Sequence, residues 1–312
     1  MISHICFTFH MPLFFILSGY FMHPEREFRW KKESKELIAT YGLTALTIVA
    51  INSIGAFIMR TGTQQVFKGW AAAAYYGAGD LGNYLWPVPF RIGALWFLLA
   101  LFWAHLFVHI AYKSKHPSII IVGLFIVGYV SAQVYWLPLS IQSGMTAAAF
   151  VYCGVLAKQH GFIEYARAHW WVVVIAAAIW VAAIVGFDGF SMAMNQYGRG
   201  PHFVLSVLGA LTGTVSVLTV SMLLDRHVNS AADILSRFGK NSLAILCIHI
   251  IEDDVTPWQV LLPSLAHMMP SSAIWFVVFA VRLAVDVFFA WVLFCIPRIN
   301  ELFFPYLAKA KG

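Results

Sequence analysis

The chain has 312 residues, of which 61% are hydrophobic and only 11% are charged. A soluble domain carries about 25% charged residues, so this composition excludes a soluble globular protein. In a chain this apolar, the formal net charge of +6 is typical of the cytoplasmic loops of a membrane protein rather than of a nucleic-acid-binding surface, and we expect no nucleic acid among its partners.

Apolar runs of about twenty residues recur along the whole length and predict a single all-α membrane domain over residues 1–312, a polytopic bundle of about nine transmembrane helices. The fifth run is short for the roughly 30 Å of bilayer hydrocarbon, and the eighth carries acidic residues near its end. The predicted spans are residues 2–22, 37–59, 92–112, 118–137, 144–157, 170–187, 203–224, 241–258 and 273–296.

The distribution of Lys and Arg between alternate loops gives the orientation. With residues 23–36 placed in the cytoplasm, most of the basic residues fall inside, as the positive-inside rule requires. The carboxyl terminus is then cytoplasmic and Met1 lies outside. Only four basic residues fall outside in this arrangement: Arg60, Lys68, Arg91 and Arg199.

The most specific motif of the chain is FHMPLFFILSGYF at residues 9–21. Pro12 is expected to break a first helical turn, and Ser18-Gly19 permits a close approach of another helix. The stretch resembles the FHMPLFFxxSGY signature of the acyltransferase-3 family, the integral membrane O-acyltransferases that include acetylases of sugars and cell-surface polysaccharides.

Further matches to the same family follow in the expected order. GALWFLLALF at residues 93–102 is similar to the family's LWFLxALF helix, and residues 137–154 resemble its P-x-S helix start. FGKNSL at residues 238–243, leading to His249, is similar to its late G-K-N-S-L…H segment. The resemblance therefore extends from Phe9 to about Glu252.

The resemblance implies a function as well as a fold. The chain is most similar to the short members without a soluble domain, such as fucose 4-O-acetylase and the enterobacterial common antigen acetylase. We therefore expect a multi-pass protein of the bacterial inner membrane that transfers acetyl from acetyl-CoA to a sugar hydroxyl of a cell-surface glycan. Its expected partners are acyl-CoA, the glycan acceptor and membrane lipids.

One departure from the family pattern concerns the start of the chain. The family has ten spans with both termini cytoplasmic, and its first helix carries an Arg-x10-His motif whose His is the expected catalytic base. Nine spans with Met1 outside are what remains when that helix is removed, so we expect it to be missing from this sequence. A truncated, inactive family member stays an alternative, as does a permease or exporter with a few buried charges.

Acyl transfer to a hydroxyl needs a base that takes the hydroxyl proton, and three residues are candidates for this chemistry. His10 is an ionisable group at the outer end of the first span, where such groups usually face an interior or a watery cavity. His249 and Glu252 are three residues apart on one helix face and are expected to act as base and orienting group or as a proton-coupled pair. A structural polar contact between helices remains the alternative for each of them.

Cations are needed to hold an anionic carrier such as coenzyme A. The candidates form one cytoplasmic segment, whose interspersed acidic residues also fit an ordinary topology-setting loop. Trp96 is a candidate for the wall of an acyl tunnel, with ordinary packing as the alternative. The cationic candidates are Arg26, Arg29, Lys31, Lys32 and Lys35.

No metal site is expected. His105 and His109 share a helix face at i, i+4, but the sequence places no third ligand beside them. Arg282 and Asp286 have the same spacing in the last span, and we expect them to form an ion pair that reduces the cost of placing both charges in hydrocarbon.

Overall fold

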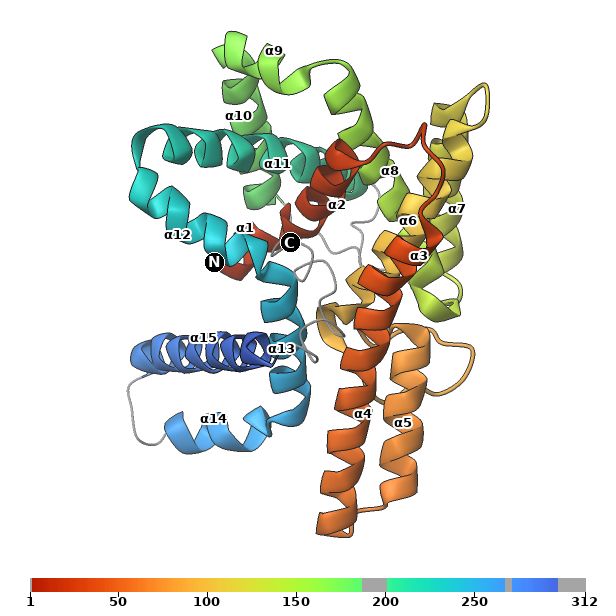
Figure 1. The fold of residues 1–312 in the computed structure, drawn as a ribbon, viewed down its shortest axis with the longest axis vertical. Helices are drawn as coiled ribbons and strands as arrows, with labels where there is room; N and C mark the ends of the chain where they lie inside the picture. Colours follow the sequence, from red (N-terminus) through yellow and green to blue (C-terminus); the bar gives the residue numbers. More distant parts are fainter. Residues whose placement is uncertain (1, 187–200, 267–270, 297–312) are drawn as a thin grey trace. The chain divides into compact units, whose positions relative to one another are not determined.

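The computed structural model describes residues 2–186, 201–266 and 271–296. Within these ranges the chain forms helices and short connections, and the only β-type pairing is an isolated bridge between Tyr84 and Trp136. The predicted all-α class is confirmed (Figure 1). Helices satisfy their own backbone polar groups, which hydrocarbon requires of a spanning segment.

Five helices of the described residues are long and apolar enough to cross a membrane. Two bent pairs raise this number to seven if each pair is one span: residues 162–168 with 170–186, bent by 101°, and residues 232–240 with 242–255, bent by 64°. The two other predicted spans coincide with shorter apolar helices, Ile5–Phe21 and Pro117–Ala132. The five long helices are Trp30–Met59, Gly93–Tyr112, Pro138–Gln159, Phe203–His227 and Ala273–Leu293.

The helices belong to two compact units, which share α6 (Trp96–Tyr112) and α12 (Asn229–Lys240). The first unit contains α1 (Ile2–Phe7), α2 (His10–Phe21), α7 (Pro117–Ala132), the 3-10 turn η3 (Pro138–Ser140), α8 (Ile141–Gln159), α9 (Phe162–Ala168), α10 (Trp170–Gly186) and α11 (Pro201–His227). The second contains α3 (Trp30–Glu33), the π-helical turn η1 (Ser34–Ile38), α4 (Ala39–Met59), α5 (Thr63–Tyr76), the 3-10 turn η2 (Gly93–Leu95), α13 (Ser242–Val255), α14 (Trp258–Ala266) and α15 (Ser271–Cys295).

Close packing of α2 against α8 organises the first unit. A Cβ placed on Gly19 of α2 would overlap the backbone carbonyl of Val151, and one placed on Gly154 of α8 would overlap the carbonyl of Ile16. Each glycine therefore lets the backbone of the other helix approach, as small residues do in membrane helix pairs. This contact explains the Ser-Gly step that the sequence motif contains.

The helical segment that contains α8 begins earlier than predicted. The sequence placed its start at residue 144, whereas α8 begins at Ile141 and the strained turn η3 precedes it from Pro138. Leu139 and Ser140 have φ angles of +61° and +52°, in the left-handed region that residues other than glycine rarely adopt. The buried Gln142 side chain supports the turn: Oε1 accepts from the Leu137 N–H at 2.7 Å, and Nε2 donates to the Tyr135 carbonyl at 2.8 Å. These bonds satisfy backbone groups that the turn would otherwise leave unpaired.

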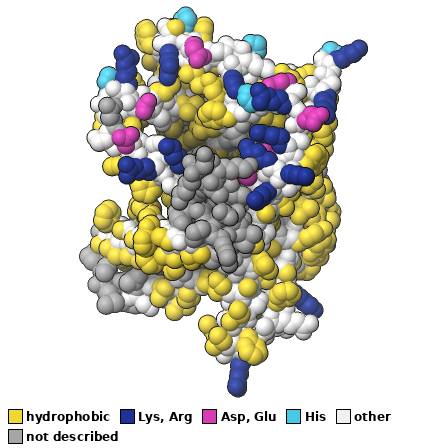
Figure 2. Space-filling model, viewed as in Figure 1, with side chains coloured by type: hydrophobic (Ala, Val, Ile, Leu, Met, Phe, Trp, Pro, Cys, Tyr) yellow, Lys and Arg dark blue, Asp and Glu magenta, His cyan; other side chains and the backbone are white. Residues whose placement is uncertain are grey.

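The second unit is built on contacts of α4 with α5 and of α13 with α4, α15 and η2. The Tyr41 hydroxyl of α4 donates to the Ala74 carbonyl of α5, and the Asn52 amide donates to the Asp254 carbonyl of α13 at 3.4 Å. Apolar side chains cover much of the visible surface of α14 and α15 (Figure 2). Trp275 and Phe276 of α15 are among the exposed large apolar residues of the protein. Such a surface suits contact with lipid.

We predict that Gly19→Ala destabilises the protein, because the added methyl group must push α2 away from Val151. Overpacking of this kind costs about 1–3 kcal/mol, and thermal unfolding in detergent measures it. Gly42→Ala is the matched control, since nothing lies within 4 Å of a Cβ built there. It should hold or raise the unfolding temperature, because alanine is the better helix former. Equal effects of the two substitutions would contradict the packing account.

Candidate active site

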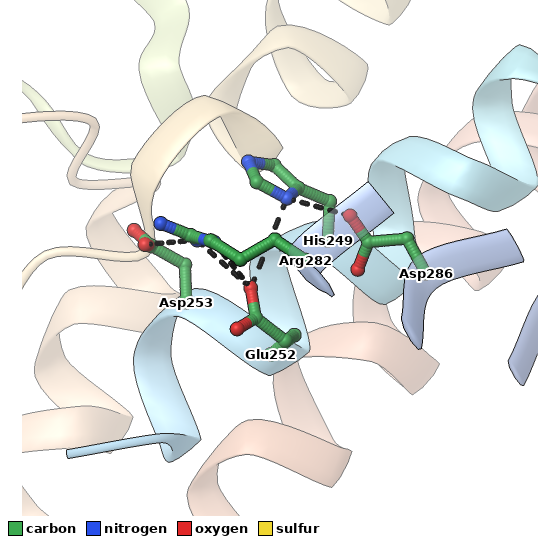
Figure 3. A network of polar contacts seen from close by, with 5 residues as sticks. All are labelled: His249, Glu252, Asp253, Arg282 and Asp286. Carbon is green, nitrogen blue, oxygen red and sulfur yellow. Dashed lines mark hydrogen bonds and ion pairs between the residues drawn. The ribbon is translucent and has the colours of Figure 1, made fainter. Parts of the chain in front are cut away.

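Five ionisable residues of the second unit gather between two helices (Figure 3). His249, Glu252 and Asp253 come from α13, and Arg282 and Asp286 come from α15. Residues three or four apart lie on one face of a helix, so each helix turns its ionisable residues toward the other. The result is a partly buried polar cluster between two apolar helices, a setting in which membrane proteins place functional charges.

His249 and Asp286 form the shortest contact of the imidazole. The His249 Nδ1–H donates to Asp286 Oδ2 at 2.9 Å, whereas Glu252 Oε2 lies 3.9 Å from the same nitrogen. The proton on Nδ1 leaves the lone pair on Nε2, which faces away from both carboxylates (Figure 3). The His249 side chain is 45% exposed while that of Asp286 is only 5% exposed, so the imidazole is accessible and the carboxylate that orients it is buried.

Arg282 neutralises the acidic end of α13. Its Nη2 lies 2.8 Å from Glu252 Oε2, its Nε donates to the same oxygen at 3.0 Å, and Nη2 also donates to Asp253. The guanidinium lies over the Trp258 ring, 4.9 Å from its centroid. Glu252, whose side chain is 8% exposed, is thus held by two N–H donors, and an unpaired carboxylate at this depth would be costly.

The predicted pairing of Arg282 with Asp286 within the last span is wrong for this structure. Arg282 instead pairs with Glu252 and Asp253, and Asp286 pairs with His249. The spacing of four residues puts both groups on the face of α15 that meets α13, where partners on the neighbouring helix satisfy them. Asp286 and Asp253 were missed as site residues, although the charge of Asp286 inside an apolar run was a signal.

The cluster also meets the geometric condition for a metal site. Ligand atoms of His249, Glu252 and Asp286 all lie within 4.8 Å of one another, and Asp286 Oδ1 is buried without a hydrogen-bond partner among the described residues. A metal would need the Nδ1 lone pair, whereas the 2.9 Å bond to Asp286 needs the Nδ1 proton. A metal on Nδ1 and a hydrogen bond from Nδ1 to Asp286 therefore exclude each other. Arg282 favours the hydrogen bond, because it already occupies Glu252 Oε2, which would be a metal ligand.

Comparison with known proteins decides the family. The model of the acyltransferase-3 family, described as an acyltransferase domain, matches residues 1–295. The chain belongs to the acyltransferase-3 family. No curated protein and no solved structure matches it significantly.

The signature segment of this acyltransferase-3 member contains His10, which lies at the start of α2 in the first unit. The His10 Nδ1–H donates to the Cys6 carbonyl at 2.8 Å, and the ring packs edge-on against Phe7. His10 belongs to the first unit and His249 to the second, so each of the two predicted bases is described within its own unit. The bond to Cys6 gives His10 a structural role and leaves its Nε2 as an acceptor.

The basic candidates for donor binding lie in the segment that precedes the second predicted span, residues 37–59. Arg26 and Arg29 precede α3, while Lys31, Lys32 and Lys35 lie on α3 and η1. All except Lys32, which is half-buried and 3.7 Å from Glu36 Oε2, are exposed. Most of these cations are therefore open to an anionic ligand.

The side chains of Trp96, His105 and His109 on α6 all contact neighbouring parts of the chain. Trp96 is 5% exposed and so close to Gly79 that a Cβ there would overlap its ring. His105 Nε2 is 3.2 Å from Ser18 Oγ, and His109 is buried with its ring 5.5 Å from that of Phe28. Neither histidine belongs to a group of three metal-ligating side chains in the described part of the chain.

We predict that Arg282→Gln destabilises the protein by about 3 kcal/mol, because it leaves Glu252 buried without a counter-charge. The unfolding temperature in detergent reports this loss. A second variant, Arg282→Gln with Glu252→Gln, removes both charges and should recover most of the stability. An unfolding temperature of the double variant below that of Arg282→Gln would contradict the ion pair as the reason for the loss.

Proposed function

We propose that this acyltransferase-3 member transfers acetyl from acetyl-CoA to a sugar hydroxyl of a cell-surface glycan at the bacterial inner membrane. Family membership supports acyl transfer. The acetyl group, the glycan and the fucose 4-O-acetylase-like or enterobacterial common antigen acetylase-like subgroup rest on the resemblance of the motifs at residues 9–21, 93–102 and 238–243.

The 2.9 Å bond between His249 and Asp286 carries the mechanism. In the proposed reaction the Nε2 lone pair of His249 takes the proton of the acceptor hydroxyl, and the hydroxyl oxygen attacks the thioester carbonyl. Collapse of the tetrahedral intermediate breaks the carbon–sulfur bond, and the imidazolium returns its proton to the departing thiolate of coenzyme A. Asp286 holds the productive tautomer and stabilises the imidazolium, as the carboxylate of a catalytic triad does.

Glu252 and Arg282 are positioning residues in this proposal. Glu252 lies 3.9 Å from His249 Nδ1, so its negative charge also favours the imidazolium, while Arg282 keeps that carboxylate in place. Without Arg282, two buried carboxylates would face the imidazole and repel each other. The ion pair of Arg282 with Glu252 therefore allows His249 and Asp286 to form a dyad although Glu252, a second carboxylate, lies beside them.

The donor and the acceptor are assigned to different groups of side chains. The exposed cations of residues 26–35 suit the phosphates of acetyl-CoA, because charge-assisted hydrogen bonds to phosphate are strong. Trp86 and Tyr75, which are 42% and 53% exposed, stack with ring centroids 6.1 Å apart and suit the apolar face of a sugar. Trp96 remains a candidate for the wall of the acyl passage, and His10 remains a second candidate base.

The experiment is transfer of labelled acetyl from acetyl-CoA to candidate glycans by the purified protein. We predict that His249→Gln and Asp286→Asn each lower kcat by about 10²–10⁴, because general base catalysis is worth that much, with little change in the KM of acetyl-CoA. His116→Gln, at an exposed histidine outside both candidate sites, is the matched control and should leave kcat unchanged. His10→Gln is assayed beside them.

Three results would count against this assignment. Absence of acetyl transfer to any glycan would refute the proposed substrates, and full activity of both His249→Gln and Asp286→Asn would refute the dyad. Loss of activity on removal of metal with a chelator, restored by zinc or manganese, would show that His249 Nδ1 binds a metal instead.

A further inference from the structure

A mostly apolar, partly open cavity of about 390 Å³ lies within the first unit and is lined by residues of α2, α8, α9 and α11. Gly161, with a φ angle of +60°, lets the chain turn sharply from α8 into α9, so that α9 lies along one side of the cavity. The volume is in the range of small-molecule sites, about 300–1,000 Å³. Its apolar wall includes Leu17, Leu156, Phe162, Ile163, Leu211 and Leu218.

The hydroxyl groups of the wall do not call for a polar ligand. Thr214 and Thr219 line the cavity, and each donates to a carbonyl of its own helix, at 2.8 Å in both cases. The other polar groups on the wall are the Tyr20 hydroxyl, the His160 ring and the Cys153 thiol. Water bound in a cavity needs two to four polar partners, and most of this wall is apolar. An alkyl chain is therefore the occupant that the wall favours.

Two cations contact residues of the cavity wall. Lys158 Nζ lies 6.0 Å from the centroid of the Tyr20 ring, and the Arg167 guanidinium donates to Met222 Sδ at 3.1 Å. Tyr20 and Met222 both line the cavity. Lys158 and Arg167 are themselves exposed, so each leaves a positive charge beside a wall residue that an anionic group can approach.

We propose that this cavity binds one anionic phospholipid, with an acyl chain between α2, α8, α9 and α11 and the phosphate at Lys158 and Arg167. The apolar wall and the paired cations fit the two halves of such a lipid, and the surrounding membrane supplies it. A basic side chain near anionic lipid contributes roughly 1 kcal/mol. The two cations together therefore give a preference of roughly tenfold or more for an anionic over a zwitterionic headgroup.

Lipid retention measures this preference. The full chain is placed in bilayers of equal parts phosphatidylglycerol and phosphatidylcholine. The protein is then released from the bilayer, and native mass spectrometry counts the lipids that stay bound to it. We expect one retained lipid, with phosphatidylglycerol in at least roughly tenfold excess. Lys158→Gln with Arg167→Gln should reduce the ratio to about one, whereas Lys113→Gln with Lys115→Gln, at two other exposed cations, should leave it unchanged. Equal retention of both lipids by the unaltered protein would overturn the proposal.

A second pair of variants tests the acyl chain. Ala157→Trp fills the cavity and should abolish retention, while Ala168→Trp, at an exposed position of α9 that does not line it, should not. Cys153 also lines the cavity, so phosphatidylglycerol should slow its reaction with an alkyl maleimide in a protein that still folds. Unchanged retention in Ala157→Trp, or reaction of Cys153 at the same rate with and without phosphatidylglycerol, would refute occupation of the cavity.

Discussion

The pairing of charges between α13 and α15 is the constraint on which the candidate site depends. A carboxylate or a guanidinium inside hydrocarbon is costly unless a partner compensates it. Glu252 therefore needs Arg282, and Asp286 needs the N–H of His249. The same requirement that makes the cluster possible also fixes the imidazole tautomer, because only a protonated Nδ1 can satisfy Asp286. The chemistry that we propose for His249 thus follows from how the membrane domain buries its charges.

Much of the fold could be predicted from the sequence, because hydrocarbon leaves the backbone few choices. Each predicted span coincides with an apolar helix or a bent pair, and the Ser-Gly step in residues 9–21 is a helix contact, as its small residues indicated. The bends were harder to foresee. The left-handed residues Leu139 and Ser140 are held by Gln142, whose partners become neighbours only when the chain turns back on itself.

The sequence pointed to four of the five ionisable residues of the candidate site, but it did not single out Asp253 and it did not predict how the charges pair. His249 and Glu252 stood out as ionisable groups on one face of an apolar helix, and Arg282 and Asp286 stood out in the same way. Spacing along one helix favoured Arg282 with Asp286, yet each found a partner on α13 instead. A contact between helices depends on their axial register, which the spacing of residues within either helix does not encode. The sequence therefore predicts which charges are buried, whereas their pairing requires the structure.

The central claim is that His249 and Asp286 act as one unit in acyl transfer, and a double-mutant cycle tests it most directly. The kcat of acetyl transfer is measured for His249→Gln, for Asp286→Asn and for the protein that carries both. Residues that act as a unit lose no more together than the more damaging single change removes, so we expect the double variant to match the weaker single variant. Losses that multiply in the double variant would show two independent contributions and contradict the dyad.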